Sequence, residues 1–331
     1  MNILKLRFLT IVAAVLACAF AAGQGHAQMG YPHKTVTLIT HSSPGGGTDV
    51  YLREMVKHLG PIMGVDFAVQ NVRGGSGSKA MAKMATSPAD GSIFYGTTPT
   101  FINTSLLSKP KYTYKDLEPL VNIFLDPQVV YVRAESPFKS LKQAIEDAKA
   151  RPGKQKWGTG TPGSLERQAM EQLKKVAGVD VIVVTHDGGG DLLISVLNGT
   201  VDLGVAEVQE LRGQLDAKKV RLIGSFTDTP LDNFPEVKTA KAQGIDMVVT
   251  KFRGIAGPKG LPPDVIKAWE AGIQKVLASP AFKKWYERGS LVPTFKPHAA
   301  YGKFIADFAK GQQAFFKEYG ITKRKKKKKK K

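Results

Sequence analysis

The strongest constraint in this sequence is a glycine-rich turn, with serine or threonine beside it, that recurs at four junctions between a predicted strand and a predicted helix. The four turns span residues 42–48, 73–78, 158–164 and 186–190. Each follows a short run of β-branched or aromatic residues and precedes an amphipathic stretch. This alternation predicts an α/β fold with mostly parallel sheets and helices on their faces.

The length of the chain predicts two domains. The 331 residues are 42% hydrophobic and 23% charged, which supports a sizeable core and argues against wholesale disorder. No serine- or proline-rich linker divides the halves, so two domains that share crossing strands fit better than two independent ones. The C-terminal third, residues 262–319, is predicted to be mainly helical, with interruptions at Pro280 and at 291–297.

The N-terminus has the pattern of an export signal. Lys5 and Arg7 precede an apolar run over 8–22, and Ala27 ends a small-residue cleavage site, so residues 1–27 are predicted to be removed. Cys18, the single cysteine, also fits a lipoprotein cleavage box, but the apolar run continues past it and favours cleavage after Ala27. With that cleavage, the mature chain has no thiol for a disulfide or for catalysis.

The formal charge of +20 is concentrated at the two ends. Residues 323–331 supply nine positive charges and the N-terminal region two more, which leaves +9 for the rest. A run of like charges is typical of a disordered, solvated tail, and no aromatic residues are interleaved with it for base stacking. We therefore expect no nucleic-acid partner.

The glycine turns predict a site for a small anion. A helix N-terminus presents unpaired backbone N–H groups and a partial positive charge, and glycine lets the backbone approach a ligand closely. In open α/β sheets, ligands bind beyond the carboxyl ends of the strands, where these turns lie. Such a site needs neither a metal nor a catalytic side chain.

Motifs for catalysis are weak. Gly158, Gly160 and Gly163 fit a dinucleotide fingerprint, but Pro162 lies inside it and it falls in the middle of the chain. The turn at 45–48 lacks the lysine of a phosphate-binding loop, and the histidines have no metal-ligand spacing. The alternative function is an exported α/β enzyme acting on a small anionic substrate, for which we find no nucleophile or acid–base pair.

A series of motifs over residues 31–320 resembles the tripartite tricarboxylate transporter receptors, also called Bug proteins. No single motif is decisive, but their order and spacing are specific. They are Ser43-Pro44-Gly45-Gly46-Gly47-Thr48-Asp49, Asn71-Val72-Arg73-Gly74-Gly75-Ser76-Gly77, Ala89-Asp90-Gly91, Ser136-Pro137-Phe138-Lys139, Asp187-Gly188-Gly189-Gly190, Asn198-Gly199-Thr200-Val201-Asp202 and Gly257-Pro258-Lys259-Gly260-Leu261-Pro262.

The resemblance implies a periplasmic solute-binding protein of the type II binding-protein fold. Two α/β lobes joined by crossing strands would close like a Venus flytrap on a small carboxylate. Lobe 1 would comprise 28–124 plus 251–322 and lobe 2 would comprise 125–250, followed by the disordered basic tail at 323–331. The receptor would be a monomer without cofactor, metal or catalytic residues, and would deliver its ligand to a large and a small membrane subunit.

The same resemblance, together with the glycine turns, indicates the ligand-binding residues. They come from both predicted lobes: His41, Ser42, Gly46, Gly47, Thr48, Ser76, Thr97, Thr98, Thr159, Gly160, Ser164, Gly189, Gly190 and Glu207. His41 and His186 are equally compatible with a structural role. Arg167 is either a clamp for a carboxylate or, as we favour, a surface charge. Glu207 is either a ligand contact or a helix cap.

Overall fold

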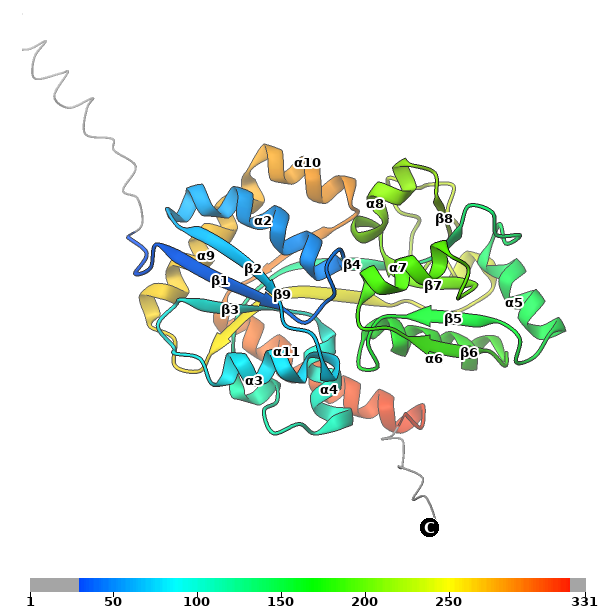
Figure 1. The fold of residues 1–331 in the computed structure, drawn as a ribbon, viewed down its shortest axis with the longest axis horizontal. Helices are drawn as coiled ribbons and strands as arrows, with labels where there is room; N and C mark the ends of the chain where they lie inside the picture. Colours follow the sequence, from blue (N-terminus) through cyan, green and yellow to red (C-terminus); the bar gives the residue numbers. More distant parts are fainter. Residues whose placement is uncertain (1–29, 322–331) are drawn as a thin grey trace, which may run out of the picture. The chain divides into compact units, whose positions relative to one another are not determined.

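The computed structural model describes residues 30–321, and the predicted export signal and basic tail lie outside the described residues. Its strands form one ten-stranded sheet with the order β2-β1-β3-β9-β4-β7-β5-β6, and β8 and β10 both pair with β4. Helices lie against the β2-β1-β3 end of the sheet and against its β7-β5-β6 end (Figure 1). The fold is therefore α/β, as the sequence predicts.

The N-terminal strand group, β1 to β3, is parallel, with β1 in its centre. Its elements are β1 (Thr35–Thr40), α2 (Gly47–Met63), β2 (Asp66–Asn71), η1 (Gly75–Gly77), α3 (Ser78–Ala85), β3 (Ile93–Thr97), α4 (Pro99–Ser108) and η2 (Tyr114–Asp116). The glycine turns at 42–48 and 73–78 join these strands to their helices. Both turns therefore lie beyond the carboxyl ends of parallel strands, where the sequence places them.

The middle strand group, β5 to β7, is parallel as well. It is built from α5 (Leu141–Ala150), β5 (Lys156–Thr159), α6 (Leu165–Ala177), β6 (Ile182–Thr185), α7 (Gly189–Leu197), β7 (Leu203–Glu207), α8 (Val208–Asp216), β8 (Val220–Ser225) and η3 (Lys241–Gln243). Ser164 begins α6 with a side-chain cap, because its Oγ accepts a hydrogen bond from the Arg167 backbone N–H. The turns at 158–164 and 186–190 thus precede α6 and α7.

Two long strands connect the strand groups, and they change the character of the sheet. The chain leaves the N-terminal group along β4 (Leu117–Arg133) and returns along β9 (Thr250–Pro258), so these neighbours run antiparallel (Figure 1). β3 with β9 and β4 with β7, β8 and β10 are antiparallel too. The expectation of mostly parallel sheets is therefore wrong for the middle of the sheet. The predicted lobe boundaries fall within β4 and at the start of β9, and the division into lobes stays a prediction.

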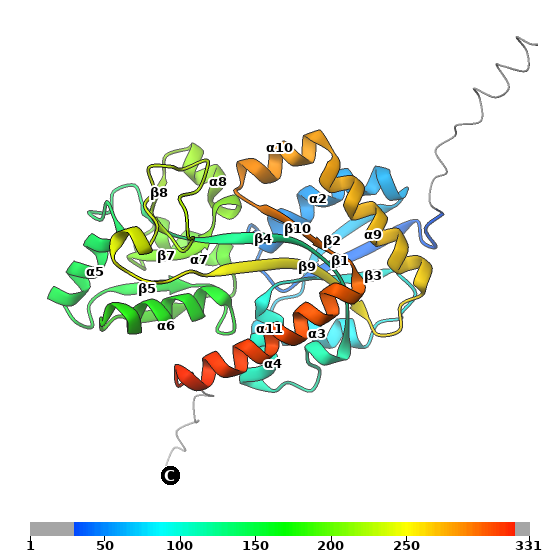
Figure 2. The same ribbon diagram turned by 180° about the vertical axis from the view of Figure 1, so that it is seen from behind.

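The C-terminal helices cover the N-terminal strand group and β4. They are α9 (Pro263–Ala278), α10 (Pro280–Arg288) and α11 (His298–Glu318), and the interruption predicted at 291–297 contains β10 (Val292–Lys296). Trp269 of α9 is fully buried against Phe94, and α11 packs on β4 (Figure 2). Among the described residues, no helix has both the length and the apolar character needed to cross a bilayer.

A substitution at Gly254 on β9 tests how tightly the crossing strands pack beneath α11. A methyl group there would lie 2.4 Å from the Tyr301 hydroxyl and 2.7 Å from the carbonyl oxygen of Val121 on β4. Because the backbone of β4 cannot move aside freely, we expect Gly254→Ala to lower the free energy of unfolding by about 1–3 kcal/mol. Urea denaturation followed by circular dichroism measures it.

Gly302 on α11 is the matched control, because nothing lies within 4 Å of a methyl group built there. Gly302→Ala should raise the free energy of unfolding by about 0.5–1 kcal/mol, since alanine loses less backbone entropy in a helix. Equal stability of the two variants would contradict the packing described for β9.

Candidate functional site

The turns beyond β1, β3, β5 and β6 converge on one cavity of about 30 Å³. Several residues that the sequence indicates as ligand-binding line this cavity: His41, Ser42, Gly47, Thr48, Thr98, Gly160, Ser164, Gly189 and Glu207. Further lining residues were not predicted: Thr100, Thr161, Glu166, Gly188, Glu210 and Lys251. The first residues of α2 and α7 lie at its wall, so helix N-termini from distant parts of the sequence face the same space.

The remaining predicted residues lie outside the lining and make internal contacts. The Ser76 hydroxyl donates to Thr161 Oγ1 at 2.7 Å and accepts from the Gly163 N–H at 2.8 Å, so it joins the turns at 73–78 and 158–164. The Thr97 hydroxyl is bonded to the Tyr301 hydroxyl at 2.9 Å, and the Thr159 hydroxyl donates to the carbonyl oxygen of Gly160 at 3.3 Å. Ser76 and Thr97 are thus held by distant parts of the chain, and Thr159 is held by the residue that follows it.

Two glycines outside the lining permit close approach of backbone segments. A methyl group on Gly190 would lie 2.2 Å from the carbonyl oxygen of Pro44, and one on Gly46 would lie 2.2 Å from Ser42 Oγ. The turns at 42–48 and 186–190 are therefore in direct backbone contact. Any larger residue at Gly190 would force these turns apart.

His41 is a buried, uncharged side chain at the cavity. Burial lowers its pKa to about 3, and the positive charges of Lys251 and Arg253 act in the same direction. Its Nδ1 is hydrogen bonded to the Tyr95 hydroxyl at 2.6 Å. By contrast, both ring nitrogens of His186 are bonded internally, Nδ1 to the carbonyl oxygen of Thr159 and Nε2 to Ser195 Oγ. The structure therefore assigns His186 a structural role.

One wall of the cavity belongs to a network of buried charges centred on Glu207. Lys251 Nζ donates to Glu207 Oε1 at 2.7 Å and to Glu166 Oε1. Arg253 Nη2 donates to Glu207 Oε2 at 2.9 Å, and its Nε donates to Asp126. The side chains of this network are at most 9% exposed. The network therefore joins β4, α6, β7 and β9.

The network of buried charges explains the role of the Glu207 side chain. Although Glu207 stands at the N-cap position of α8, its side chain makes no cap hydrogen bond. Burial would raise the pKa of this carboxyl, but Lys251 and Arg253 hold it well below its usual value. The interpretation of Glu207 as a side-chain cap is therefore wrong. Its carboxylate is instead the shared partner of two buried cations.

The sequence reasoning missed Lys251 and Arg253, although a signal was present. The two residues flank Phe252 in a strand that is otherwise apolar from Gly254 to Ala256. Side chains two residues apart in a strand point to the same face, so a pair of cations at this spacing predicts one charged face inside a core. Their acidic partners could not be found this way, because those lie 44 to 127 positions away in the sequence.

Arg167 is outside the cavity. Its guanidinium bonds Glu171 one turn further along α6, with Nε to Oε1 at 2.8 Å, and its side chain is 34% exposed. The structure thus agrees with a surface charge. Within residues 30–321, no three His, Cys, Asp or Glu side chains are placed to hold a metal ion.

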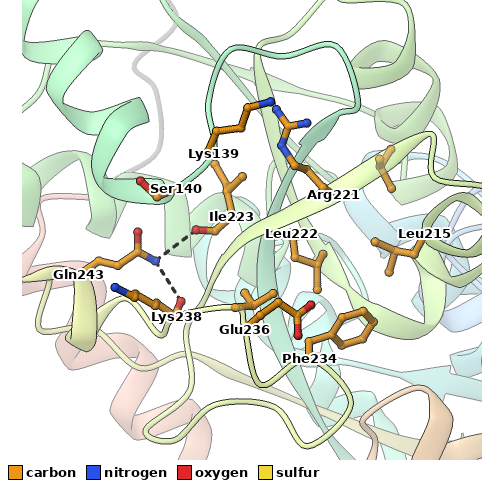
Figure 3. Close-up of a pocket in the computed structure, with 12 residues that line it drawn as sticks. Lys139, Ser140, Leu215, Arg221, Leu222, Ile223, Phe234, Glu236, Lys238 and Gln243 are labelled. Carbon is orange, nitrogen blue, oxygen red and sulfur yellow. Dashed lines mark hydrogen bonds between the residues drawn. The ribbon is translucent and has the colours of Figure 1, made fainter.

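A larger cavity of about 450 Å³ lies elsewhere, against β8 (Figure 3). Its walls are mainly aliphatic and charged side chains. The amide of Gln243 donates to the carbonyl oxygens of Ile223 and Lys238, at 3.2 and 3.0 Å. None of the glycine turns reaches this cavity, so it offers no backbone donors of the kind found at the turns.

Removing the arginine of the network tests its contribution to stability. Arg253→Met leaves the Asp126 carboxyl without its cation and Glu207 with only Lys251. We expect the free energy of unfolding at pH 7 to fall by about 3–5 kcal/mol, because the remaining buried charges lose their partner. Urea denaturation measures it. As a control, Lys303→Met breaks an exposed pair with Asp307 and should leave the urea midpoint unchanged. Similar midpoints for both variants would contradict the network's role.

The low pKa of His41 predicts how the free energy of unfolding depends on pH. The folded state keeps the ring neutral down to about pH 3, whereas the unfolded chain binds a proton below about pH 6.5. Stability therefore falls as the pH drops from 6.5 toward 3. Between pH 7 and 5 the wild-type protein should lose about 2 kcal/mol that His41→Gln does not lose. Denaturant titrations at both pH values measure this difference, and parallel pH curves would argue against a neutral buried His41.

A family model for the tripartite tricarboxylate transporter family receptor matches residues 51–321. Two relatives are similar over nearly their whole lengths. The "UPF0065 protein in gbd 5'region" of Cupriavidus necator is 26% identical, with 95% of this chain and 96% of the relative covered. Protein BugT of Bordetella pertussis is 26% identical, with 91% of this chain and 94% of the relative covered.

Solved structures have the same fold. The periplasmic binding protein BugD matches with a TM-score of 0.84 at 21% identity, covering 89% of this chain and 100% of BugD. An R. palustris protein solved with adipate matches with a TM-score of 0.83 at 23% identity, covering 88% of this chain and 98% of that protein. MatC from Rhodopseudomonas palustris, solved with malate, gives 0.76 at 20% identity, covering 87% of this chain and 98% of MatC.

The family model covers most of the chain, and three of the motifs that resemble Bug proteins, 43–49, 71–77 and 187–190, lie at the glycine turns described above. The function of such receptors is binding and not catalysis. The chain belongs to the tripartite tricarboxylate transporter receptor family, with the α/β fold of periplasmic binding proteins.

Proposed function

We propose that the protein is an extracytoplasmic receptor that captures a small carboxylate between two lobes and delivers it to the membrane subunits of a tripartite tricarboxylate-type transporter. The observation that carries this proposal is the convergence of glycine turns and helix N-termini on one small cavity. Membership of the receptor family supports the same function. Adipate and malate in two proteins of the same fold support a carboxylate as the ligand class.

The helix N-termini supply the chemistry for a carboxylate. Gly47 begins α2 and Gly189 begins α7, and neither helix has a side-chain cap. Their first N–H groups therefore need an acceptor from outside the helix, and an anion placed there also gains from the helix dipoles. Hydroxyls of Ser42, Thr98 and Thr161 at the cavity add donors.

The size of the cavity supports a mechanism with opening and closing. About 30 Å³ holds a water molecule but not a dicarboxylate. The turns at 42–48 and 186–190 must separate to admit a ligand, because Gly188 and Gly190 lie against Ser43 and Pro44. The crossing strands β4 and β9 are continuous between the strand groups, so bending within them is the simplest way to open the site.

Location and partners follow from the same proposal. Residues 1–27 would direct export to the periplasm and be removed, with lipid attachment at Cys18 as the alternative. The closed, ligand-bound monomer would be recognised by the large and small membrane subunits. An exported enzyme on this fold would need a nucleophile or an acid–base pair at the cavity, and His41 is unsuited to proton transfer near neutral pH because burial keeps it uncharged.

Carboxylate binding by the mature protein tests the proposal. The protein is refolded to remove co-purified ligand and then titrated calorimetrically with mono-, di- and tricarboxylates, with NAD as a control. We expect one or a few carboxylates to bind and NAD not to bind. Ser42→Ala removes a hydroxyl from the cavity and should lower the affinity for the carboxylate about tenfold or more, since hydrogen bonds to charged groups contribute about 1.5–3 kcal/mol.

Ser87→Ala is the control, because the Ser87 hydroxyl donates to the carbonyl oxygen of Lys83 on the surface of the N-terminal strand group. It should leave the affinity unchanged. Binding of NAD without binding of any carboxylate would contradict the receptor function. Equal affinities of both serine variants would contradict the location of the site.

A further inference from the structure

Two buried carboxyl groups at the cavity each have an oxygen atom that accepts no hydrogen bond from the described part of the chain. Glu210, in the first turn of α8, is 8% exposed, and its Oε1 has no hydrogen-bond partner among residues 30–321. Glu166, in the first turn of α6, is 7% exposed. One of its oxygens accepts from Lys251, whereas its Oε2 has no partner within the same range. Both side chains line the cavity.

Acidic side chains outnumber cationic side chains around the cavity. Glu166, Glu207 and Glu210 line it together with one cation, Lys251. Lys251 is already shared by Glu166 and Glu207, and Arg253 is shared by Glu207 and Asp126. Both cations of this buried network are thus used by other acids, and Glu210 has none. A second carboxylate on the ligand would meet this excess of acids, whereas a cationic group would be paired by it.

The unbonded oxygens lie close to the turns that would hold a carboxylate. The Glu210 carboxyl is against the start of α7, because a methyl group on Gly189 would lie only 1.5 Å from its Oε1. A methyl group on Gly160 would lie 3.6 Å from Glu166 Oε2. The acceptors for a cation and the donors for an anion are therefore only a few atoms apart, which fits a compact ligand with both groups.

We propose that the receptor's ligand is a carboxylate that also carries an ammonium group, as in a small amino acid, and that Glu210 and Glu166 accept hydrogen bonds from this group. The inference rests on the proposed function, because the carboxylate of the ligand is placed at the glycine turns. An ammonium group has three donors and no acceptor, which matches a cavity wall with unbonded carboxyl oxygens. Hydrogen bonds between an ammonium and a carboxylate group are stronger than hydrogen bonds between neutral groups.

The titration of Glu210 supplies a second readout. Burial raises the pKa of Glu210 well above its usual value, and the negative charge of Glu207 adds to the effect, whereas Lys251 and Arg253 oppose it. An ammonium group bound beside Glu210 favours the ionised carboxylate, so binding should release a proton. The titratable groups that face this carboxyl are Tyr131, Glu166, Glu207, Lys251 and Arg253.

The experiment uses pairs of ligands that differ by one amino group: propanoate and alanine, succinate and aspartate, glutarate and glutamate. Affinities are measured calorimetrically on the mature, refolded protein, in two buffers with different heats of ionisation at pH 7. We expect at least one amino compound to bind tenfold or more tightly than its partner and to release a proton. Glu210→Gln should reduce this preference at least tenfold and abolish the proton release.

Two further variants keep the test independent of folding. Glu236→Gln makes the same chemical change at an exposed position of the cavity in Figure 3 and should alter neither the preference nor the proton release. Glu166→Gln should reduce the preference as Glu210→Gln does. All variants are compared at equal folded fraction, judged by circular dichroism.

The outcomes separate this inference from the proposed function. Tighter binding of succinate or glutarate than of their amino counterparts, or an unchanged preference in Glu210→Gln, overturns the inference and leaves the carboxylate receptor in place. Absence of binding by every compound, with and without the amine, overturns both.

Discussion

The site depends on the pairing of Glu207 with Lys251 and Arg253. Each of these side chains is almost fully buried, and a buried charge is tolerated only when it is paired and hydrogen bonded. One carboxylate with two cations therefore fixes the end of β7 against β9. Arg253 extends this to α2, because its Nη1 donates to Thr48 Oγ1 at 3.1 Å. The walls of the cavity are thus held together by the same charges that set its electrostatic character.

The glycine turns have two roles that depend on each other. Their N–H groups at the starts of α2 and α7 are suited to an anion, and their missing side chains let the turn at 42–48 touch the turn at 186–190. Ser76 adds a hydroxyl bridge to the turn at 158–164. A ligand enclosed between these turns would replace contacts that the turns otherwise make with each other. In the proposed function, binding and closing would therefore depend on the same short segments.

Local patterns in the sequence were sufficient for the fold class and for much of the site. The alternation of strands, glycine turns and helices is reproduced. Many of the indicated residues line the cavity. Ser76 and Thr97 lie where the sequence predicts the site, but their hydroxyls are bonded 85 and 204 positions away, and no local pattern reveals such distant partners. The Thr159 hydroxyl is instead bonded to the adjacent Gly160 carbonyl oxygen.

The sequence by itself determined the elements and the places where turns present backbone donors, because both depend on residues near one another in the chain. Only the tertiary structure decided that β4 and β9 run antiparallel and that Lys251 and Arg253 meet acids 44 to 127 positions away. It also decided that Glu210 remains without a cation. Charge pairing inside a protein depends on which groups are buried together, and burial is set by the packing of the whole fold.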